Sequence, residues 1–162
     1  KKKLQLNSLE YLQNEKFFMN YFKKIENKIS NIYSNLTIPK NITNQLLKTN
    51  WTKISKIRRN NWENLDLLIG KKYKKIFKSL MPFETPIGYI IFVKDRNKLR
   101  NYLKKKRIFT AVHWPLHEKS KLQKFKYETL LSKHLITIPI DQRYRKSDMA
   151  YIAKQIIESG IK

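Results

Sequence analysis

The hydrophobic periodicity of this 162-residue chain changes at Ile87, and that change constrains the fold more than any other feature. Before Ile87, apolar residues recur every three or four positions, as in the series Phe18, Phe22, Ile25, Ile29 and Ile32. After it, short β-branched runs alternate with segments of helical spacing. Helical spacing gives a helix one apolar face, whereas a short apolar run between turn residues is typical of a buried strand. The sequence therefore predicts helices first and a mixed α/β region second.

Turn and cap residues divide the helical part of the chain. Pro39 interrupts the first helical pattern, so residues 35–43 are expected to form a turn or loop. Asn50 is a favoured N-cap for a second helix, and Gly70 follows that helix where a C-terminal stop belongs. We therefore predict three regions, which are a helical arm or linker over residues 1–49, a helix leading into a small domain over residues 50–80, and a small α/β domain over residues 81–162.

Three apolar runs predict the strands of the small domain. They are "IGYIIFV", "RIFTAVHW" and "HLITIPI", and helical segments separate and follow them. Asp95 and Ser147 are expected to cap two of those helices, and Gly160 is expected to stop the last one. Such alternation is typical of a sheet covered by helices. The predicted fold class is α/β (α+β), with an N-terminal helical arm followed by a small sheet of about three strands covered by helices.

The net charge of +24 raises the question of a nucleic-acid partner. Lysine outnumbers arginine 29 to 7, although specific phosphate and base contacts favour arginine. The charge is also even, because residues 1–80 hold 18 basic and 5 acidic side chains and residues 81–162 hold 18 and 7. The chain is rich in Lys, Asn and Ile, as expected for an AT-rich genome. Composition bias therefore explains the charge better than a nucleic-acid footprint does.

Composition also excludes several classes of protein. The chain has no cysteine, which rules out disulfide scaffolds, cysteine-based zinc sites and thiol nucleophiles, and which fits a cytoplasmic location. Three scattered glycines cannot form a phosphate-binding loop. No apolar run approaches the roughly 18 residues of a membrane span, so no membrane partner is expected. The chain lacks an initiator methionine, and we expect it to be part of a longer protein or a processed one.

The stretch "FTAVHWPLH" gathers the rarest side chains of the sequence. His113 and His117 lie four residues apart, which on a helix would align them for a metal. Pro115 disfavours that helix and no acidic third ligand accompanies the pair, so no metal site is predicted. The alternative is a strand that turns through proline into a loop, and such loops often carry binding residues. For His113 and Trp114, packing at a sheet end and contact with a ligand both fit.

Two other polar stretches are candidates for function. In "IDQRY", Asp141 and Arg143 fit a surface ion pair, although Arg143 could instead meet an anionic ligand and Tyr144 could stack or hydrogen-bond. In "KIRRNNWENL", Arg58 and Arg59 are most simply the solvated edge of an amphipathic helix.

These stretches carry a resemblance to a known family. The segments "KIRRNNWENLDLL", "GYIIFVKDRNKLRNYLKKKRIFTAVHWPLH" and "LITIPIDQRYRKSDMAYIAKQI" resemble, in order, the C-terminal part of the DegT/DnrJ/EryC1/StrS aminotransferases. These are the sugar-nucleotide aminotransferases among the fold-type-I PLP enzymes. The resemblance covers roughly residues 50–158, and "VHWPL" and "IPIDQRY" are its most specific elements. It implies a small domain that closes over a PLP site built mainly by a preceding large domain.

The resemblance carries further expectations about chemistry. No lysine of this chain matches the family's Schiff-base motif, so the chain alone is expected to be inactive and no catalytic residue is assigned. His113, Trp114 and His117 are expected near the mouth of the active site, in contact with the substrate or the neighbouring subunit, and Arg143 and Tyr144 are further candidates for substrate contact. The resemblance implies PLP as the cofactor of the complete protein and a nucleotide-sugar as its substrate. It also implies a homodimer that supplies amino sugars for surface polysaccharide.

Two other readings of the sequence stay open beside this resemblance. The first is a basic α/β nucleic-acid-binding module, which would need exposed aromatic residues such as Tyr89, Phe92 and Phe109 on adjacent strands. The second is a structural or regulatory remnant of the enzyme that is kept for dimer contacts alone.

Overall fold

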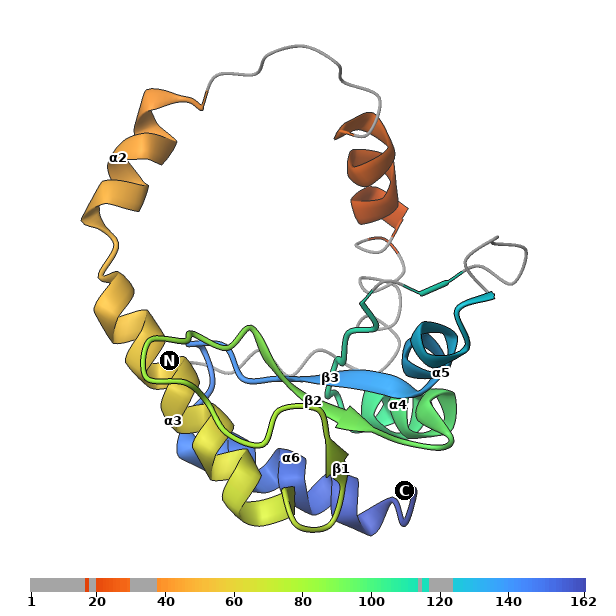
Figure 1. The fold of residues 1–162 in the computed structure, drawn as a ribbon. Coiled ribbons are helices and arrows are strands. Elements are labelled where there is room, and N and C mark those ends of the chain that lie inside the picture. Colours follow the sequence, from red (N-terminus) through yellow and green to blue (C-terminus); the bar gives the residue numbers. More distant parts are fainter. Residues whose placement is uncertain (1–16, 18–19, 30–37, 114, 117–123) are drawn as a thin grey trace. The chain divides into compact units, whose positions relative to one another are not determined.

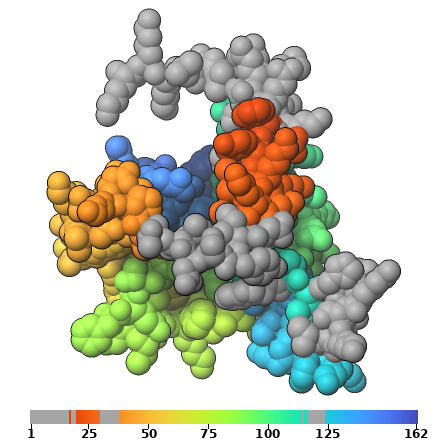
Figure 2. Space-filling view, turned by 90° about the horizontal axis from the view of Figure 1, so that it is seen from above, coloured from red at the N-terminus to blue at the C-terminus, as the bar shows by residue number. Residues whose placement is uncertain are grey.

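The computed structural model describes residue 17 and residues 20–29, 38–113, 115–116 and 124–162 of the chain. The chain divides into two units, Lys1–Thr49 and Asn50–Lys162. The first unit is helical over most of its described part, with one helix over residues 20–29 and helix α2 over Lys40–Lys48. No residue of α2 is buried. Phe22, Ile25 and Ile29 of the predicted stripe are also exposed, while Phe18 and Ile32 lie outside the described residues. The helix over residues 20–29 is the red segment of Figure 2.

The loop predicted for residues 35–43 is wrong over residues 40–43, which form the start of α2. Pro39 is the N-cap of this helix, and its carbonyl oxygen accepts hydrogen bonds from the amides of Ile42 at 3.0 Å and Thr43 at 3.1 Å. A proline interrupts a helix in its interior but is tolerated at the start, because the first turn needs no amide donor there.

The second unit contains a three-stranded antiparallel sheet in the order β1-β2-β3, seen in Figure 1. The strands are β1 over Lys74–Lys75, β2 over Gly88–Phe92 and β3 over Leu135–Pro139. Strands β2 and β3 pair along their whole length. This confirms the predicted fold class, which is a small sheet of about three strands combined with helices.

The identity of the third strand differs from the prediction. Residues 107–114 were predicted as a strand, but within the described residues they make one isolated bridge, between Ala111 and Thr137. The amide of Ile108 donates back to Leu103 at 2.9 Å, which keeps the start of this segment in the end of a helix. The strand that completes the sheet is instead β1, which lies within residues 50–80, predicted as a helix leading into the small domain, and which is too short and lysine-rich to show a strand pattern.

Helices cover one face of the sheet. They are α3 over Trp51–Ile69, α4 over Arg96–Lys105 and α6 over Lys146–Glu158. Helix α5 over Lys126–His134 leads directly into β3 and has no buried residue. Helices α3 and α6 pack against each other, α3 contacts β2 and α4 contacts β3 (Figure 1). Their buried face and that of the sheet form the core, whose residues are Trp62, Leu65, Ile69, Tyr73, Tyr89, Ile91, Val93, Leu99, Leu103, Ile108, Ile136, Ile138, Ile140, Met149, Ile152, Ala153 and Ile156.

The two faces of β2 differ in burial. Tyr89 and Ile91 are fully buried, whereas Gly88, Ile90 and Phe92 are only partly buried. Successive side chains of a strand point to opposite faces, so the first pair faces the core and the other three residues lie on the opposite face. We call that opposite side the open face.

The predicted helix ends are mostly confirmed. The Asn50 side chain accepts a hydrogen bond from the amide of Lys53 at 2.8 Å and caps α3. Gly70 is the C-cap of α3, with a φ of −60°. Asp95 is the N-cap residue of α4, but its side chain makes no capping hydrogen bond. Gly160 has a φ of +64° just beyond α6, a conformation that glycine adopts readily.

The prediction that Ser147 caps the last helix is wrong. Helix α6 begins at Lys146, and its N-cap is Arg145, two residues before Ser147. The carboxylate of Asp148 accepts a hydrogen bond from the amide of Arg145 at 2.7 Å. Asp148 thus supplies the acceptor half of a capping box, and its charge is also favourable at a helix N-terminus.

Candidate functional site

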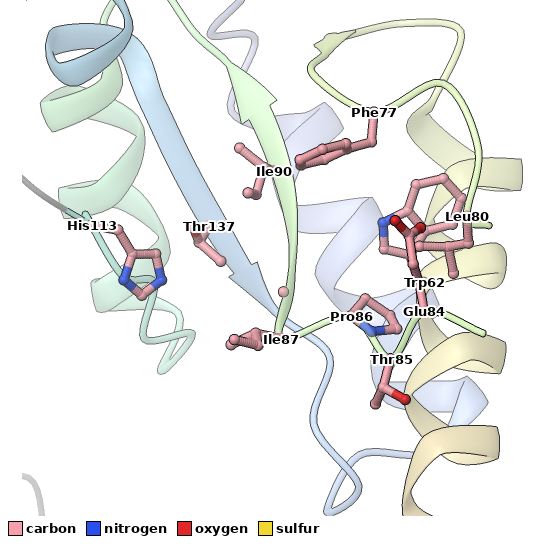
Figure 3. Close-up of a pocket in the computed structure, with 11 residues that line it drawn as sticks. Trp62, Phe77, Leu80, Glu84, Thr85, Pro86, Ile87, Ile90, His113 and Thr137 are labelled. Carbon is pink, nitrogen blue, oxygen red and sulfur yellow. The ribbon is translucent and has the colours of Figure 1, made fainter. Parts of the chain in front are cut away.

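A pocket of about 410 Å³ opens beside the start of β2, on the open face of the sheet (Figure 3). Its lining comes from α3, from the loop that precedes β2, from both long strands and from the segment after the Ala111 bridge. The lining residues are Trp62, Phe77, Leu80, Glu84, Thr85, Pro86, Ile87, Gly88, Ile90, His113 and Thr137. In Figure 3, His113 and Trp62 lie on opposite sides of β2, so the pocket spans the strand.

Gly88 is required for the geometry of this pocket. A Cβ atom at this position would lie 2.1 Å from the Cγ2 atom of Thr137 and 3.2 Å from the carbonyl oxygen of Ile138. Only glycine therefore allows Thr137 to occupy its place across from β2. The Thr137 amide also donates to the Ala111 carbonyl at 3.0 Å and the Thr137 carbonyl accepts from the Ala111 amide at 3.1 Å, and this isolated bridge brings His113 to the pocket.

Helix α3 fixes the loop that forms one wall of the pocket. The Arg59 guanidinium donates to the carbonyl oxygens of Met81 at 2.8 Å and Glu84 at 2.6 Å. The hydroxyls of Ser55 and Thr85 lie 2.6 Å apart, and the Glu84 carboxylate accepts from the Met81 amide at 2.7 Å. The prediction that Arg59 is a solvated edge residue is therefore wrong, because its guanidinium holds this loop.

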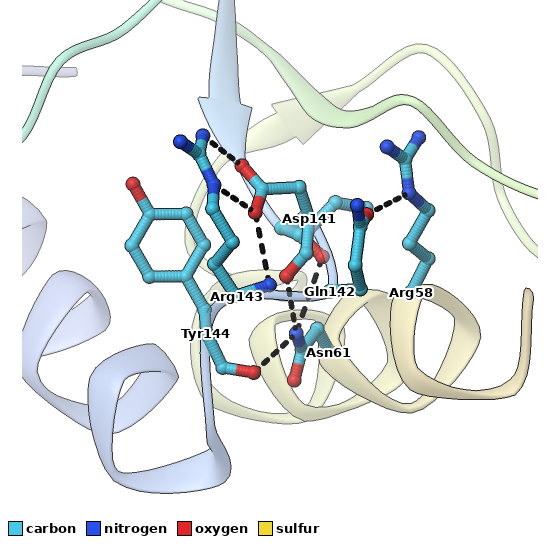
Figure 4. A network of polar contacts seen from close by, with 7 residues as sticks. Arg58, Asn61, Asp141, Gln142, Arg143 and Tyr144 are labelled. Atoms are coloured by element: carbon cyan, nitrogen blue, oxygen red, sulfur yellow. Dashed lines mark hydrogen bonds and ion pairs between the residues drawn. The ribbon is translucent and has the colours of Figure 1, made fainter. Parts of the chain in front are cut away.

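A second polar network joins α3 to the chain after β3 (Figure 4). The Asn61 side chain is buried and donates to the carbonyl oxygens of Ile140 at 3.1 Å, Asp141 at 3.2 Å and Tyr144 at 3.1 Å. Asn61 interrupts the apolar stripe of α3 for this reason. Buried carbonyl groups need donors, and one amide satisfies three of them here.

Ion pairing fixes the side chains at the surface of this network. Arg143 donates to both carboxylate oxygens of Asp141, each at 2.8 Å, and its amide donates to the same carboxylate at 3.0 Å. These bonds hold the pKa of Asp141 below its usual value. The Arg58 side chain donates to Gln142 at 3.0 Å, so Arg58 is not simply solvated either. The ion pair expected from "IDQRY" is therefore confirmed.

Tyr144 is half-buried against the core. Burial raises the pKa of its phenol above the usual value, so the hydroxyl stays protonated at neutral pH. With Arg143, Tyr144 lines a groove that also includes Asn60, Asn61 and Asn64. This groove and the pocket around His113 have no lining residue in common.

The five residues predicted to contact substrate therefore do not come together in one described site. His113 is exposed and lines the pocket, whereas Arg143 and Tyr144 line the separate groove. Trp114 and His117 lie outside the described residues. Sequence reasoning missed Trp62 and Thr137 as pocket residues, and it read Gly88 only as one of three scattered glycines. A glycine at the start of an apolar strand is the one signal that could have indicated this close approach.

The lining of the pocket does not fit PLP on its own. PLP needs a lysine amine for its aldehyde and charged or amide groups for its phosphate. The described lining offers one imidazole, two threonine hydroxyls and the carboxylate of Glu84, and it includes no lysine or arginine. These residues can contact a substrate, but they cannot hold the cofactor without groups from elsewhere.

The structure also bears on other classes of site. No helix in the described segments is both long and apolar enough to cross a bilayer. Among the same residues, no group of three or more histidine or acidic side chains is arranged to hold a metal ion. The aromatic residues considered for stacking nucleic-acid bases are not aligned on adjacent strands, because Tyr89 is fully buried and Phe109 lies outside the sheet.

Comparisons with known proteins identify the fold. No protein-family model matches the chain, and no curated protein matches its sequence. Among solved structures, Spr1654 from Streptococcus pneumoniae, described as a sugar aminotransferase, matches in its PMP-form with a TM-score of 0.59 at 16% identity over 67% of this chain. Its PLP-form matches with a TM-score of 0.56 at 17% identity, also over 67% of this chain. A DegT DnrJ EryC1 StrS aminotransferase from Brucella abortus matches with a TM-score of 0.53 at 14% identity over 65% of this chain.

These matches define what this chain shares with aminotransferases. The chain has the fold of a part of the DegT/DnrJ/EryC1/StrS-type sugar aminotransferases. It covers 31% of the length of each of these solved chains, so the likeness concerns about a third of such a protein.

Proposed function

We propose that this chain serves as the small domain of a PLP-dependent aminotransferase that acts on a keto-sugar nucleotide. The observation that carries the proposal is the fold, which matches two-thirds of this chain to about a third of sugar aminotransferases. An amino acid would donate the nitrogen, and the amino sugar would enter surface polysaccharide in the cytoplasmic stage of its synthesis. The complete protein would act as a homodimer.

In this proposal, the pocket around His113 forms one wall of the substrate site. The imidazole of His113 and the hydroxyl of Thr137 can hydrogen-bond to a sugar hydroxyl or a phosphate. Trp62, Phe77 and Ile87 supply the apolar surface that such a pocket needs to fix a ring and exclude water. The role of these residues is to bind and orient the substrate.

A large domain would form the opposite wall. Phe77 and Ile87, which line the pocket, are 54% and 77% exposed, and Met81 and Phe83 in the loop before β2 are 63% and 99% exposed. Contiguous exposed apolar surface is typical of a face that another domain or subunit covers. The same large domain would hold PLP, because the described lining of the pocket lacks the groups to do so.

Steady-state kinetics on the natural-length protein that carries these residues test the proposal. The protein is assayed with PLP, glutamate and a keto-sugar nucleotide. We expect PLP-dependent formation of the amino sugar, and a His113→Ala variant with KM raised about tenfold, since one hydrogen bond to a charged group contributes about 1.5 kcal/mol. The control is Lys98→Ala, an exposed position of α4 outside the pocket.

The outcomes separate the activity from the site. Absence of transamination with a range of keto-sugar nucleotides would contradict the proposed function. Transamination with an unchanged KM in His113→Ala would keep the function but reject the pocket as the substrate wall.

A further inference from the structure

The sequence "KKYKK", residues 71–75, is a lysine cluster that the proposed function does not use. Tyr73 at its centre is buried, and its hydroxyl donates to the carbonyl oxygen of Ile156 at 3.0 Å. Burial also raises the pKa of this phenol. Tyr73 thus anchors the cluster to α6, while Lys72 and Lys74 on either side of it are exposed.

The cluster lies at the rim of a second pocket of about 470 Å³. The volume is within the range of small-molecule sites, roughly 300–1,000 Å³. Its lining residues are Lys72, Tyr73, Lys74, Phe92, Lys94, Leu130, His134 and Lys162. The lining therefore combines four lysines with three rings and contains no acidic side chain. Only the backbone fold brings these residues together, because they come from β1, the end of β2, α5 and the segment after α6.

Two stacked rings form the apolar part of this pocket. The rings of Phe92 and His134 have centroids 4.9 Å apart and are inclined by 29°. Lys74 is the cross-strand partner of Phe92, and its Nζ atom lies 5.1 Å from the centroid of that ring. A cation over an aromatic ring is a favourable arrangement, and it holds a positive charge next to the two stacked rings.

The orientation of the His134 ring is fixed before any ligand binds. Its Nδ1 atom lies 3.2 Å from the carbonyl oxygen of Val93 and 2.9 Å from that of Lys94. Carbonyl oxygens only accept hydrogen bonds, so Nδ1 carries the proton in this arrangement. The same contacts fix His134 to the end of β2, where Val93 and Lys94 follow Phe92.

The lysines of this pocket differ from a neighbouring lysine in their pairing. Lys75 forms a salt bridge with Asp66 at 2.5 Å. In the part of the chain that the structure describes, no carboxylate forms a salt bridge with Lys72, Lys74 or Lys94. These lysines converge on one aromatic pocket whose described lining holds no side-chain carboxylate, which is the arrangement expected of a site for a phosphate attached to a planar group.

We propose that this pocket binds a nucleoside phosphate, with the base against Phe92 and His134 and the phosphates against Lys72, Lys74 and Lys94. The nucleotide could be free or part of a single strand, and the chemistry of recognition is the same in both. The site is independent of the proposed aminotransferase role, because it has no lining residue in common with the pocket around His113.

Fluorescence anisotropy on the 162-residue chain tests the site with a labelled oligoadenylate as the probe. Unlabelled ADP and inorganic pyrophosphate compete, and they carry the same diphosphate group with and without a base. We expect ADP or the oligonucleotide to bind at least about fivefold more tightly than pyrophosphate, because stacking of a base on an aromatic ring contributes about 1 kcal/mol or more. Three phosphate contacts should weaken oligonucleotide binding about 20-fold between about 50 and 200 mM salt.

Matched variants test the residues. Phe92→Leu should weaken nucleotide binding at least about fivefold and leave pyrophosphate binding unchanged. Phe83→Leu, at an exposed aromatic residue outside the pocket, is its control. Lys74→Glu should weaken binding of both nucleotide and pyrophosphate, whereas the same charge change at Lys98 should have a much smaller effect. Lys74 is exposed, so this variant keeps the test valid if Phe92→Leu folds poorly.

Each outcome is informative. Displacement of the oligonucleotide by ADP identifies a site for free nucleotides, while binding of the oligonucleotide alone identifies a site for single strands, and both support the proposal. Equal competition by pyrophosphate and ADP, or equal effects of Lys74→Glu and Lys98→Glu, would overturn it. His113→Ala should leave ADP binding unchanged, so failure of this site and failure of the aminotransferase proposal are distinguishable.

Discussion

The same strands contribute residues to both faces of the small sheet, and the two faces differ in burial. On the covered face, Tyr89, Ile91, Ile136 and Ile138 are fully buried against the helices. The open face of β2 carries Gly88, Ile90 and Phe92, which are only partly buried and line the two pockets. Because side chains alternate along a strand, each residue contributes to one face only. The core thus lies on the covered face, while the β2 residues that line the two pockets lie on the open face.

Truncation of one neighbouring residue on each face tests this division most strongly. Ile91→Ala should lower the free energy of unfolding by about 4 kcal/mol, because it leaves a cavity in the core. Ile90→Ala, at the adjacent half-buried position, should cost only about 1 kcal/mol. Urea denaturation of both variants measures the difference. Equal losses would show that the open face is as important to stability as the covered one.

A polar substitution extends the comparison to the network on α3. Asn61→Leu should cost about 3 kcal/mol, since it removes the Asn61 donor from the carbonyl oxygens of Ile140 and Tyr144, while that of Asp141 keeps the Tyr144 amide at 3.1 Å. Asn64→Leu is the matched control, because the Asn64 side chain donates to the carbonyl of Asn60, at 2.7 Å on the exposed surface, and to no other group in the described part of the chain. The same denaturation curves check the result, and a similar loss in both variants would contradict the role of Asn61.

Gly88 is the first residue of β2 and lines the pocket on the open face. Gly88→Ala should cost about 2 kcal/mol, because its Cβ would lie 2.1 Å from Thr137 Cγ2. Adding Thr137→Ser removes that methyl group, so the double variant should be more stable than the sum of the two single effects predicts. If the losses in free energy of unfolding of the two single variants simply add in the double variant, the close contact between position 88 and Thr137 is contradicted.

The smallest effect concerns pH and the Asp141–Arg143 pair. The pKa of Asp141 is lower in the folded state, so the pair stabilises the protein above the unfolded pKa of about 3.9 and loses this effect as pH falls through the folded value. Arg143 is largely exposed, which limits the effect to below about 1 kcal/mol. Asp141→Asn should flatten the acid end of the stability curve, as measured by thermal unfolding between about pH 2 and 5. If Asp141→Asn and the unmodified protein lose thermal stability equally between about pH 2 and 5, the stabilising role of the Asp141–Arg143 pair is contradicted.

Local sequence signals predict the covered face better than the open one. The runs "IGYIIFV" and "HLITIPI" show β2 and β3 because burial requires apolar, β-branched residues there. Contacts between segments far apart in the sequence give no such local signal, as with Asn61 and Ile140, which are 79 residues apart. Spacing along the chain carries no signal for such pairs. Strand β1 is missed for the same reason, because the pairing of Lys74 with Phe92 supplies its strand character.

The candidate site shows the same limit. The stretch around His113 stands out because its residues are rare in this chain, and the structure does bring His113 to a pocket. Arg143 and Tyr144 also stand out in the sequence, but their groove is separate. Rare residue types single out a position in the sequence. The contacts of Thr137 with Ala111 and Gly88 determine which residues lie together in the pocket.

Hydrogen exchange on the natural-length protein, with and without a nucleotide-sugar, tests the central claim most directly. We predict that the ligand protects amides in residues 80–90 and 108–113, around the pocket of the open face, and leaves α4 and α6 unchanged. Protection confined to those helices, or absent from both pocket segments, would contradict the assignment of ligand binding to the open face.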